Sequence, residues 1–336
     1  MRKVLLARLD NVGDVLLAGP CVRAVAAGGD TVTMLASPRG RGGAELLPGV
    51  DDVLVWSAPW IDLDPEPVTA AGIDEFVTRI RALRFDRALI LTSFHQSALP
   101  LALLLRMAGI PWLGAISDDY PGSLLDLRHR VHGDVPESER ALSLAIAAGY
   151  RLPAGDDGGL AVRRPLPDVS RLTGERGYVV VHPAASVPAR QPTAEHAAAM
   201  VAALARAGHR VVVTGAPSER QLTALVAGEH ARDLGGATTL RELAAVLDGA
   251  AAVVAPNTGP AHLAAAVGTP VVSLFAPVVP AARWAPYRVL TVLLGDQGAP
   301  CRDTRARECP IDGHPCLESI SPLDVVAATA EVTGRR

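Results

Sequence analysis

Short apolar runs alternate with longer segments of helical periodicity along most of the chain. In the first half, these runs predict strands at residues 4–9, 31–36, 53–56, 88–92 and 112–116. The segments between them predict helices at residues 14–27, 73–83, 96–107 and 137–148. Regular alternation of strands and helices is typical of an α/β domain with a parallel sheet.

The alternation stops at residues 163–171, where the sequence is polar and contains prolines, and it then restarts. The second half predicts strands at residues 178–182, 210–214, 251–255 and 271–275, with helices at residues 193–207, 218–227, 240–247 and 260–267. We therefore predict a first domain at residues 1–162, a linker at 163–176, a second domain at 177–320 and a final helix at 321–336. Ligands of doubly wound sheets bind beyond the carboxyl ends of the strands, so the expected site is a cleft between the two domains.

The composition is that of a globular protein, because 49% of the 336 residues are hydrophobic and 20% are charged. A net charge of −3 gives no general attraction to nucleic acid or to a membrane surface. The first apolar stretch is too short and too interrupted for a signal peptide, and no apolar run approaches the roughly 20 residues that span a bilayer. Four cysteines do not make a disulfide framework in a chain of this length. The expected location is the cytoplasm.

The turn Asp-Asn-Val-Gly-Asp at residues 10–14 directly follows the first predicted strand. Gly13 allows a tight turn and a close approach of a ligand to the backbone. Asp14 then stands at the start of the next helix. It either caps that helix or serves as a general base for a hydroxyl group bound in the cleft.

Two turns of the second domain carry polar groups at the ends of strands. The turn at residues 182–190 combines small residues with Ser186 and Arg190, which suits a diphosphate because arginine offers several donors to phosphate oxygens. Gly215 and Glu219 follow the next strand. The Glu219 carboxylate either accepts hydrogen bonds from ribose hydroxyls or stabilises the N-terminus of its own helix.

A third turn, at residues 256–260, joins an apolar run to an alanine-rich helix. Its Asn257, Thr258 and Gly259 stand at the helix N-terminus, where free backbone N–H groups and the helix dipole favour an anion. His262 follows within the helix, either as a buried structural histidine or as a ligand-binding residue.

Several common motifs are absent from the sequence. There is no G-x-G-x-x-G after a strand, no G-x-x-x-x-G-K-[ST] and no G-x-S-x-G, so ordinary dinucleotide, P-loop and hydrolase sites lose support. Asp62 and Asp64 form a D-x-D pattern that could hold a divalent metal, but they lie among prolines, and we interpret the segment as a solvated loop.

Thiols are concentrated near the C-terminus. Three cysteines and a histidine of this segment could bind zinc, namely Cys301, Cys309, His314 and Cys316. No C-x-x-C pair is present among them, so we favour a reduced, buried loop and predict no metal site.

Taken in order along the chain, these turns resemble glycosyltransferase family 9, the ADP-heptose heptosyltransferases. The resemblance begins with RLDNVGDVLLAGPCVRAV and continues through VVVHPAASVPARQPTAEHAAAMVAAL and VVVTGAPSER. It ends with NTGPAHLAAAVGTPVVSLFAP, RWAPY and CPIDGHPCLESISPLDV, so it covers nearly the whole chain. The resemblance implies a GT-B fold, in which two Rossmann-like domains with parallel sheets face an interdomain cleft and the final helix returns to the first domain.

The resemblance also implies a role for each candidate residue. Asp14 falls on the family's catalytic aspartate, the base that deprotonates the acceptor hydroxyl, and the acceptor side also includes Asn11, Gly13 and His95. The donor side comprises residues that match contacts to the diphosphate, the ribose and the donor sugar, namely Ser186, Arg190, Gly215, Glu219, Asn257, Thr258, Gly259 and His262. The implied reaction is one inverting displacement at the anomeric carbon, with an ADP-sugar as donor and with no metal or cofactor.

Two departures from the family pattern concern the donor side. Asn257 stands where the family usually has aspartate, which implies either a changed donor-sugar contact or a weaker enzyme, and Gln191 stands where tryptophan is usual. The leading hypothesis is transfer of a heptose or related sugar to a hydroxyl of a surface glycan, a lipopolysaccharide core or a natural product. The alternatives are a UDP-sugar-using GT-B enzyme, either a hexosyltransferase or an epimerase, and a catalytically weak nucleotide-sugar-binding protein. We expect no nucleic-acid partner, and peripheral membrane association only where the acceptor is a lipid.

Overall fold

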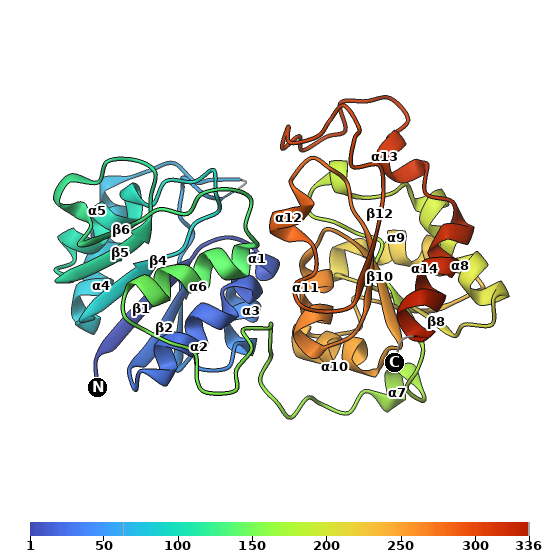
Figure 1. Cartoon of the computed structure of the whole chain (residues 1–336), viewed down its shortest axis with the longest axis horizontal. Helices are drawn as coiled ribbons and strands as arrows, with labels where there is room; N and C mark the ends of the chain where they lie inside the picture. Colours follow the sequence, from blue (N-terminus) through green and yellow to red (C-terminus); the bar gives the residue numbers. More distant parts are fainter. Residues whose placement is uncertain (63, 335–336) are drawn as a thin grey trace. The chain divides into compact units, whose positions relative to one another are not determined.

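The fold is that of a computed structural model, which describes residues 1–62 and 64–334 (Figure 1). The chain divides into two compact units, Met1–Val162 and Arg163–Arg336, and each unit contains one six-stranded sheet. All strand pairs in both sheets are parallel, which confirms the predicted fold class. Leu63, inside the D-x-D pattern, and the last two residues of the predicted final helix lie outside the described residues.

The sheet of the first unit has the strand order β3-β2-β1-β4-β5-β6. Its strands are β1 (Lys3–Arg8), β2 (Thr31–Ala36), β3 (Asp52–Val55), β4 (Arg87–Ile90), β5 (Trp112–Ile116) and β6 (Leu127–His129). Its helices are α1 (Val12–Leu17), α2 (Gly19–Ala27), α3 (Arg41–Leu46), α4 (Ala70–Leu83), α5 (Leu99–Met107) and α6 (Glu137–Ala147), with a 3-10 turn, η1, at Gly122–Leu124. Helices α1, α2, α3 and α6 pack together on one face, and α4 packs with α5 on the other.

The sheet of the second unit has the order β12-β11-β10-β7-β8-β9, which repeats the topology of the first. Its strands are β7 (Val179–Val181), β8 (Val211–Gly215), β9 (Arg232–Gly235), β10 (Ala252–Pro256), β11 (Val271–Leu274) and β12 (Thr291–Leu294). Its longer helices are α8 (Ala194–Arg206), α9 (Arg220–Ala227), α10 (Leu240–Gly249), α11 (Gly259–Val267) and α14 (Pro322–Gly334). Single turns of helix complete it at α7 (Ser170–Thr173), η2 (Pro188–Arg190), η3 (Pro217–Glu219), α12 (Ala281–Trp284) and α13 (Pro315–Glu318).

The interior strands are apolar along nearly their whole length because helices cover both faces of each sheet. Every strand predicted from the sequence is present, with bounds that differ by at most two residues. The sequence analysis missed β6, β9 and β12, which are all edge strands and are only partly buried. An edge strand buries less apolar surface, so its apolar pattern is weaker.

One predicted helix is in fact two. The helix expected at residues 14–27 is interrupted at Ala18, where α1 ends and α2 begins with Gly19 and Pro20. Proline lacks a backbone N–H group and fits the first turn of a helix rather than its middle. The prediction of one continuous helix is therefore wrong.

The final helix α14 packs within the second unit, against α8 and beside β10, β11 and β12. Its buried face, Val325, Ala328 and Val332, belongs to the apolar core that also contains Met200 and Leu204 of α8. The apolar face of α14 is thus buried within the second unit, and the packing of this helix on the first domain stays a prediction. No helix in the described ranges is both long and apolar enough to cross a membrane.

A buried hydrogen-bond cluster ties the start of β1 to the chain that follows α6. The Asp30 carboxylate accepts from Arg2 Nε at 3.1 and 3.2 Å and from the Tyr150 hydroxyl at 3.0 Å. Burial alone would raise the pKa of Asp30, but the hydrogen bonds from Arg2 and Tyr150 lower it, so the carboxylate is charged at neutral pH.

Replacing Tyr150 with phenylalanine should lower the free energy of unfolding by about 1–2 kcal/mol, since a buried charged acceptor loses one donor. Urea denaturation at pH 7 measures this loss. A depressed carboxyl pKa contributes stability above the unfolded pKa, so the difference from wild type should shrink as the pH falls below about 4. The control is Tyr120→Phe, because Tyr120 is 83% exposed. An equal loss in both variants would contradict the role of the Asp30 contact.

Candidate active site

In each sheet the first and fourth strands of the unit, in chain order, lie side by side at the centre, and successive strands are added outward from them in opposite directions. In the first unit β1 pairs with β4, and these strands lead into the turns that carry Asp14 and His95. In the second unit β7 pairs with β10, and these strands lead into the turns that carry Ser186 and Asn257. Ligands of doubly wound folds bind at such a switch point. Most of the predicted site residues thus lie in the segments that directly follow these two pairs of strands, β1 and β4 in the first unit and β7 and β10 in the second.

Arg8, the last residue of β1, is 3% exposed and faces carboxylates on three sides. Its Nε lies 2.8 Å from Asp10 Oδ2, and its Nη2 lies 3.0 Å from Asp14 Oδ1. Nη2 also donates to Ser93 Oγ at 2.9 Å, and Nη1 lies 3.7 Å from Glu137 Oε2. Burial would lower the pKa of Arg8, but the three carboxylates raise it, so this buried guanidinium stays charged. The sequence analysis did not single out Arg8.

A second buried arginine completes the cluster. Arg140 Nη1 lies 3.4 Å from Glu137 Oε2 and donates to the carbonyl oxygen of Thr92. The cluster therefore contains two guanidinium groups and three carboxylates, and its net charge is −1 when all of them are ionised.

Asp10 is the titratable member of this cluster at mildly acidic pH. Burial raises the pKa of Asp10 to about 6, and the nearby negative charge of Asp14 adds to the rise. Arg8 and a 2.6 Å hydrogen bond from Gln96 Nε2 oppose it.

Asp14 is the member most open to solvent. Its side chain is 22% exposed, against 10% for Asp10 and 1% for Glu137. The N-cap residue of α1 is Asn11, and the Asp14 carboxylate contacts Arg8 through Oδ1. Its Oδ2 has no hydrogen-bond partner among the described residues. The geometry thus gives no support to a helix-capping role for Asp14 and leaves one carboxylate oxygen available to a ligand.

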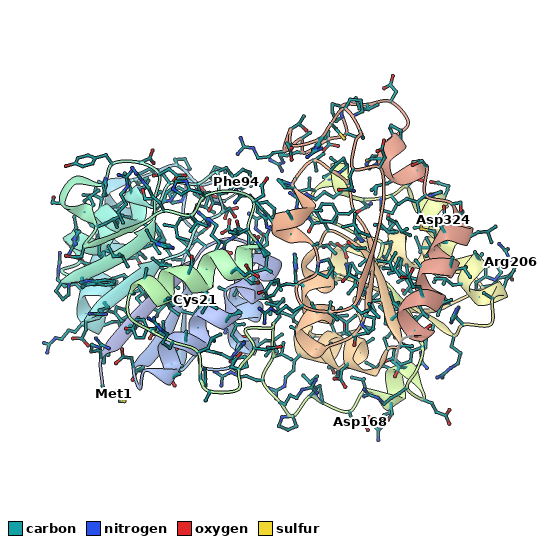
Figure 2. The ribbon with its side chains drawn as sticks, viewed as in Figure 1. Met1, Cys21, Phe94, Asp168, Arg206 and Asp324 are labelled. Carbon is teal, nitrogen blue, oxygen red and sulfur yellow. The ribbon has the colours of Figure 1, made fainter. Side chains whose placement is uncertain are left out.

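The remaining acceptor-side candidates lie in the segment after β1, which also carries Asp14, and in the loop after β4. Gly13 is buried and Asn11 is partly exposed, both within the turn that carries Asp14. His95 is exposed in the loop after β4, and its ring meets that of Phe94 edge-on with centroids 5.3 Å apart. Phe94 is labelled in Figure 2. Two neighbours in that loop, Ser93 and Gln96, contact the Arg8 cluster.

The N-terminus of α11, which follows β10, presents hydrogen-bond donors, and the turn at residues 256–260 that leads into it contains no carboxylate. Thr258 is the N-cap of α11 in an extended conformation, and its side chain makes no capping hydrogen bond. The backbone N–H groups of Thr258 and Gly259 have no acceptor within the described part of the chain. Asn257 is 5% exposed, and its Nδ2 is buried without a partner among those residues. His262 is 3% exposed in the first turn. This arrangement suits an anion with further acceptor groups.

The turn after β7 contains the other phosphate candidates. Ser186 is exposed, and Arg190 is partly buried at the end of η2. Gln191, which the sequence analysis noted only as a departure, accepts a hydrogen bond from the Ala185 N–H at 3.0 Å. It therefore fixes the turn that carries Ser186.

His182, the first residue of this turn, is buried. Its Nδ1 lies 3.1 Å from Thr214 Oγ1 at the end of β8. Burial lowers the pKa of His182 to about 4, so the imidazole is neutral at pH 7. It links β7 to β8 without adding charge.

Gly215 and Glu219 have structural roles that the geometry explains. A Cβ at Gly215 would lie 2.5 Å from Thr223 Cγ2, so the close packing of β8 on α9 requires glycine there. Glu219 Oε2 accepts from the Ala216 N–H at 2.6 Å and so stabilises the start of its own helical turn. The geometry gives direct support only to the structural alternative for Glu219.

The thiol segment braces the turn of Arg190. The Ala189 N–H donates to the Arg307 carbonyl at 2.9 Å, and His314 Nε2 lies 3.1 Å from the Ala189 carbonyl oxygen. Cys301 and Cys316 are buried free thiols, and burial together with neighbouring thiols raises the pKa of Cys316 to about 12. Within residues 1–62 and 64–334, no three His, Cys, Asp or Glu side chains are arranged to hold a metal ion.

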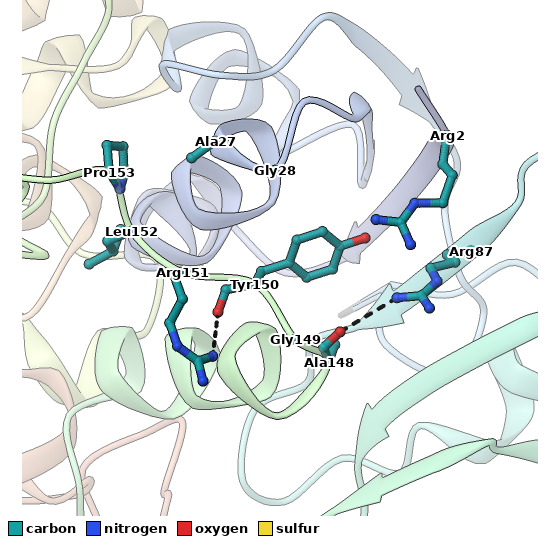
Figure 3. Close-up of a pocket in the computed structure, with 10 residues that line it drawn as sticks. All are labelled: Arg2, Ala27, Gly28, Arg87, Ala148, Gly149, Tyr150, Arg151, Leu152 and Pro153. Carbon is teal, nitrogen blue, oxygen red and sulfur yellow. Dashed lines mark hydrogen bonds between the residues drawn. The ribbon is translucent and has the colours of Figure 1, made fainter.

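A cavity of about 540 Å³ in the first unit is lined by three arginines, but it lies away from these turns (Figure 3). It is formed where α2 and α6 end, near the starts of β1 and β4. Arg87 donates to the Ala148 carbonyl at 3.5 Å, and Arg151 donates to the Tyr150 carbonyl at 2.8 Å. These guanidinium groups satisfy carbonyls exposed at the end of α6, which is a structural role.

Sequence comparison identifies relatives of this chain. The profile described as "Glycosyltransferase family 9 (heptosyltransferase)" matches residues 73–314. Lipopolysaccharide heptosyltransferase 3 of Escherichia coli is 31% identical over 164 residues, which cover 46% of this chain and 46% of that protein. The match therefore spans less than half the length of this relative.

Structural comparison extends the likeness to both units. The glycosyl transferase family 9 protein of Veillonella parvula superposes with a TM-score of 0.81 at 16% identity, over 100% of this chain and 98% of that one. The E. coli ADP-heptose lps heptosyltransferase II gives 0.75 at 19% identity over 99% of both chains. The E. coli heptosyltransferase WaaC with ADP-2-deoxy-2-fluoro heptose gives 0.71 at 20% identity, over 98% of this chain and 99% of that one.

The family match covers most of the chain, and the fold agrees with it over the whole length. The resemblance stated from the sequence is thereby confirmed. This chain belongs to glycosyltransferase family 9, the heptosyltransferase family, and is a transferase with the two Rossmann-like units of the GT-B fold.

Proposed function

We propose that this chain transfers a heptose or a closely related sugar from an ADP-sugar to an acceptor hydroxyl, with inversion at the anomeric carbon and without a metal ion. The acceptor is a hydroxyl of a surface glycan, a lipopolysaccharide core or a natural product, and the reaction takes place in the cytoplasm. Family membership supports sugar transfer in general.

The observation that carries this proposal is the exposure of the Asp14 carboxylate and the contacts of its two oxygens. It is the most exposed carboxylate of a buried charged cluster, one of its oxygens is held by Arg8, and the other is available. A general base needs a carboxylate oxygen within hydrogen-bond reach of the hydroxyl that it deprotonates. The Asp14 Oδ2 atom is the oxygen available for such a contact.

The donor side of the proposal rests on the second unit. The free N–H groups at the start of α11 and the Arg190 guanidinium supply positive partial and full charge for a diphosphate. The buried Asn257 amide donates to an oxygen of the donor, and His262 lines the same helix turn. Ser186 adds a hydroxyl from the turn after β7.

The proposed reaction is a single displacement. The acceptor oxygen loses its proton to Asp14 and forms a bond to the anomeric carbon as the bond from that carbon to the ADP oxygen breaks. ADP departs with the bonding electron pair, and the charge that develops on its phosphate is stabilised by Arg190 and the α11 N-terminus. One base suffices because no covalent intermediate forms, and attack opposite the leaving group inverts the configuration.

Asp14→Asn should lower kcat by about 100- to 10,000-fold, because the amide cannot accept the proton. Transfer is measured as ADP release from ADP-heptose with an acceptor found by screening, and ADP affinity by calorimetry should not change. The matched control is Asp52→Asn, since Asp52 is an exposed carboxylate whose one hydrogen bond within the described ranges is from the neighbouring Val53 N–H. Full activity in Asp14→Asn would rule out the base assignment.

Arg190→Ala should weaken ADP binding by about 10- to 100-fold, the equivalent of one charge-assisted hydrogen bond. Isothermal titration calorimetry measures this affinity directly. The control is Arg206→Ala, because Arg206 is exposed in the last turn of α8 (Figure 2). Unchanged ADP affinity in Arg190→Ala would remove this residue from the diphosphate site.

Nucleotide selectivity tests the donor class and the absence of a metal requirement. Calorimetry with ADP, UDP and GDP, each with and without magnesium, should show selective binding of ADP that EDTA does not weaken. Preference for UDP would favour a hexosyltransferase or an epimerase. Transfer activity that disappears with EDTA and returns with a divalent ion would overturn the metal-free mechanism.

A further inference from the structure

We infer that a small cavity after β3, within the first unit, binds an aminated ring of the acceptor, that is, a sugar or cyclitol ring that carries ammonium groups. This ring is the part of the acceptor that lies remote from the attacked hydroxyl. The inference rests on the proposed function, because it names the chemical class of the acceptor for that reaction.

The cavity has a volume of about 210 Å³ and lies between the end of β3 and the start of α4. Its apolar lining includes Trp56, Pro59, Pro67 and Ile73. Pockets that hold a whole drug-sized ligand have volumes of roughly 300–1,000 Å³. This cavity therefore suits a single ring of a larger molecule.

The lining is held in place by contacts within the first unit. The Trp56 ring stacks on Phe76 of α4 with centroids 3.9 Å apart, and it meets the Trp60 ring at an angle of 65°. Thr69 Oγ1 accepts from the Gly72 N–H at 3.2 Å and so caps the N-terminus of α4. A ligand thus meets a preformed cavity and does not have to order these side chains.

Glu66 is the only charged residue that lines the cavity within the described part of the chain. It is exposed, and no ion pair or hydrogen bond joins its carboxylate to another described residue. Because Thr69 already caps α4, the Glu66 carboxylate is not required for that role. A ring bound beside this carboxylate gains energy from a positive group and loses energy from a negative one.

The neighbouring segments at the same edge of the sheet carry the same sign of charge. The segments after β3 and β5 contain no lysine or arginine but five acidic residues, namely Asp62, Asp64, Glu66, Asp118 and Asp119. Arg39 is the one basic residue in the segments that follow β1 to β5, and it pairs with Asp62. An acceptor with phosphate or carboxylate groups is therefore repelled here, whereas an aminated acceptor is attracted.

The cavity also lies within reach of Asp14 along the sheet. Only β2 separates β3 from β1, so the ends of these two strands are about 10 Å apart. The Ser37 hydroxyl after β2 donates to the Asp10 carbonyl oxygen at 2.7 Å, and Arg39 pairs with Asp62, so the segments after all three strands are joined. An acceptor of more than one ring can thus extend from Asp14 to the cavity.

The test is the binding of neamine, a two-ring aminated polyol, to protein labelled with 15N-tryptophan in the presence of EDTA. The chain has four tryptophans, and the indole N–H resonance of Trp56 is assigned by its loss in Trp56→Phe. Neamine should shift this resonance and leave that of Trp284, in the second unit, unchanged. Neamine with acetylated amines keeps its rings but loses its charge, so it should bind at least about 10-fold more weakly. Maltose 1-phosphate, a two-ring anion, should leave Trp56 unshifted.

Glu66→Gln should raise the Kd of neamine about 3-fold or more, which is the loss of one exposed ion pair. The matched control is Glu75→Gln, because Glu75 is an exposed carboxylate of α4 that does not line the cavity. An unchanged Kd in Glu66→Gln, or an equal loss in both variants, would overturn the inference. So would the absence of a Trp56 shift with neamine, or an equal shift with maltose 1-phosphate.

The inference and the proposed function fail in different ways. An active Asp14→Asn enzyme would remove the base assignment and leave the binding of neamine at Trp56 as it is. Transfer from ADP-heptose to phosphorylated acceptors, with none to aminated ones, would overturn the inference and leave the proposed function intact.

Discussion

Parallel pairing of the first and fourth strands in each unit is the constraint on which both candidate sites depend. The pairs β1–β4 and β7–β10 place turns that are distant in sequence next to each other at one edge of a sheet. The bond from Arg8 to Ser93 crosses this switch point in the first unit, and the bond from the His182 N–H to the Val254 carbonyl does so in the second. Without this strand order, Asp14 would lack the neighbours that fix it.

The two switch points differ in charge. The first is crowded with carboxylates around Arg8, whereas the second offers neutral or positive groups: the α11 N-terminus, the Asn257 amide and the Arg190 guanidinium. A diphosphate brings its own negative charge, so a carboxylate beside it costs electrostatic energy that an amide does not. Asparagine at position 257 fits this division of charge between the units.

The sequence predicts the interior of both sheets well because strands buried on both faces are continuous apolar runs, as in β1 and β7. The edge strand β9 escapes prediction because its first two residues, Arg232 and Asp233, are charged and exposed, so it shows no apolar run. Asp14 could be predicted, since a carboxylate after a Gly-containing turn is a local signal. Arg8 could not, because its partners, Glu137 in particular, come from distant parts of the chain and are joined only by folding.

The same argument applies to the thiol segment. Its cysteines and histidine suggest a metal in sequence, but the side chain of His314 is turned onto the Ala189 carbonyl. His314 adopts a left-handed backbone conformation, φ 47°, which is unfavourable for a residue with a Cβ and persists where surrounding contacts compensate. The contact of its side chain is with Ala189, the residue immediately before Arg190, so His314 holds the turn that carries this proposed diphosphate-binding residue. The segment is better explained as a brace for this turn than as an independent site.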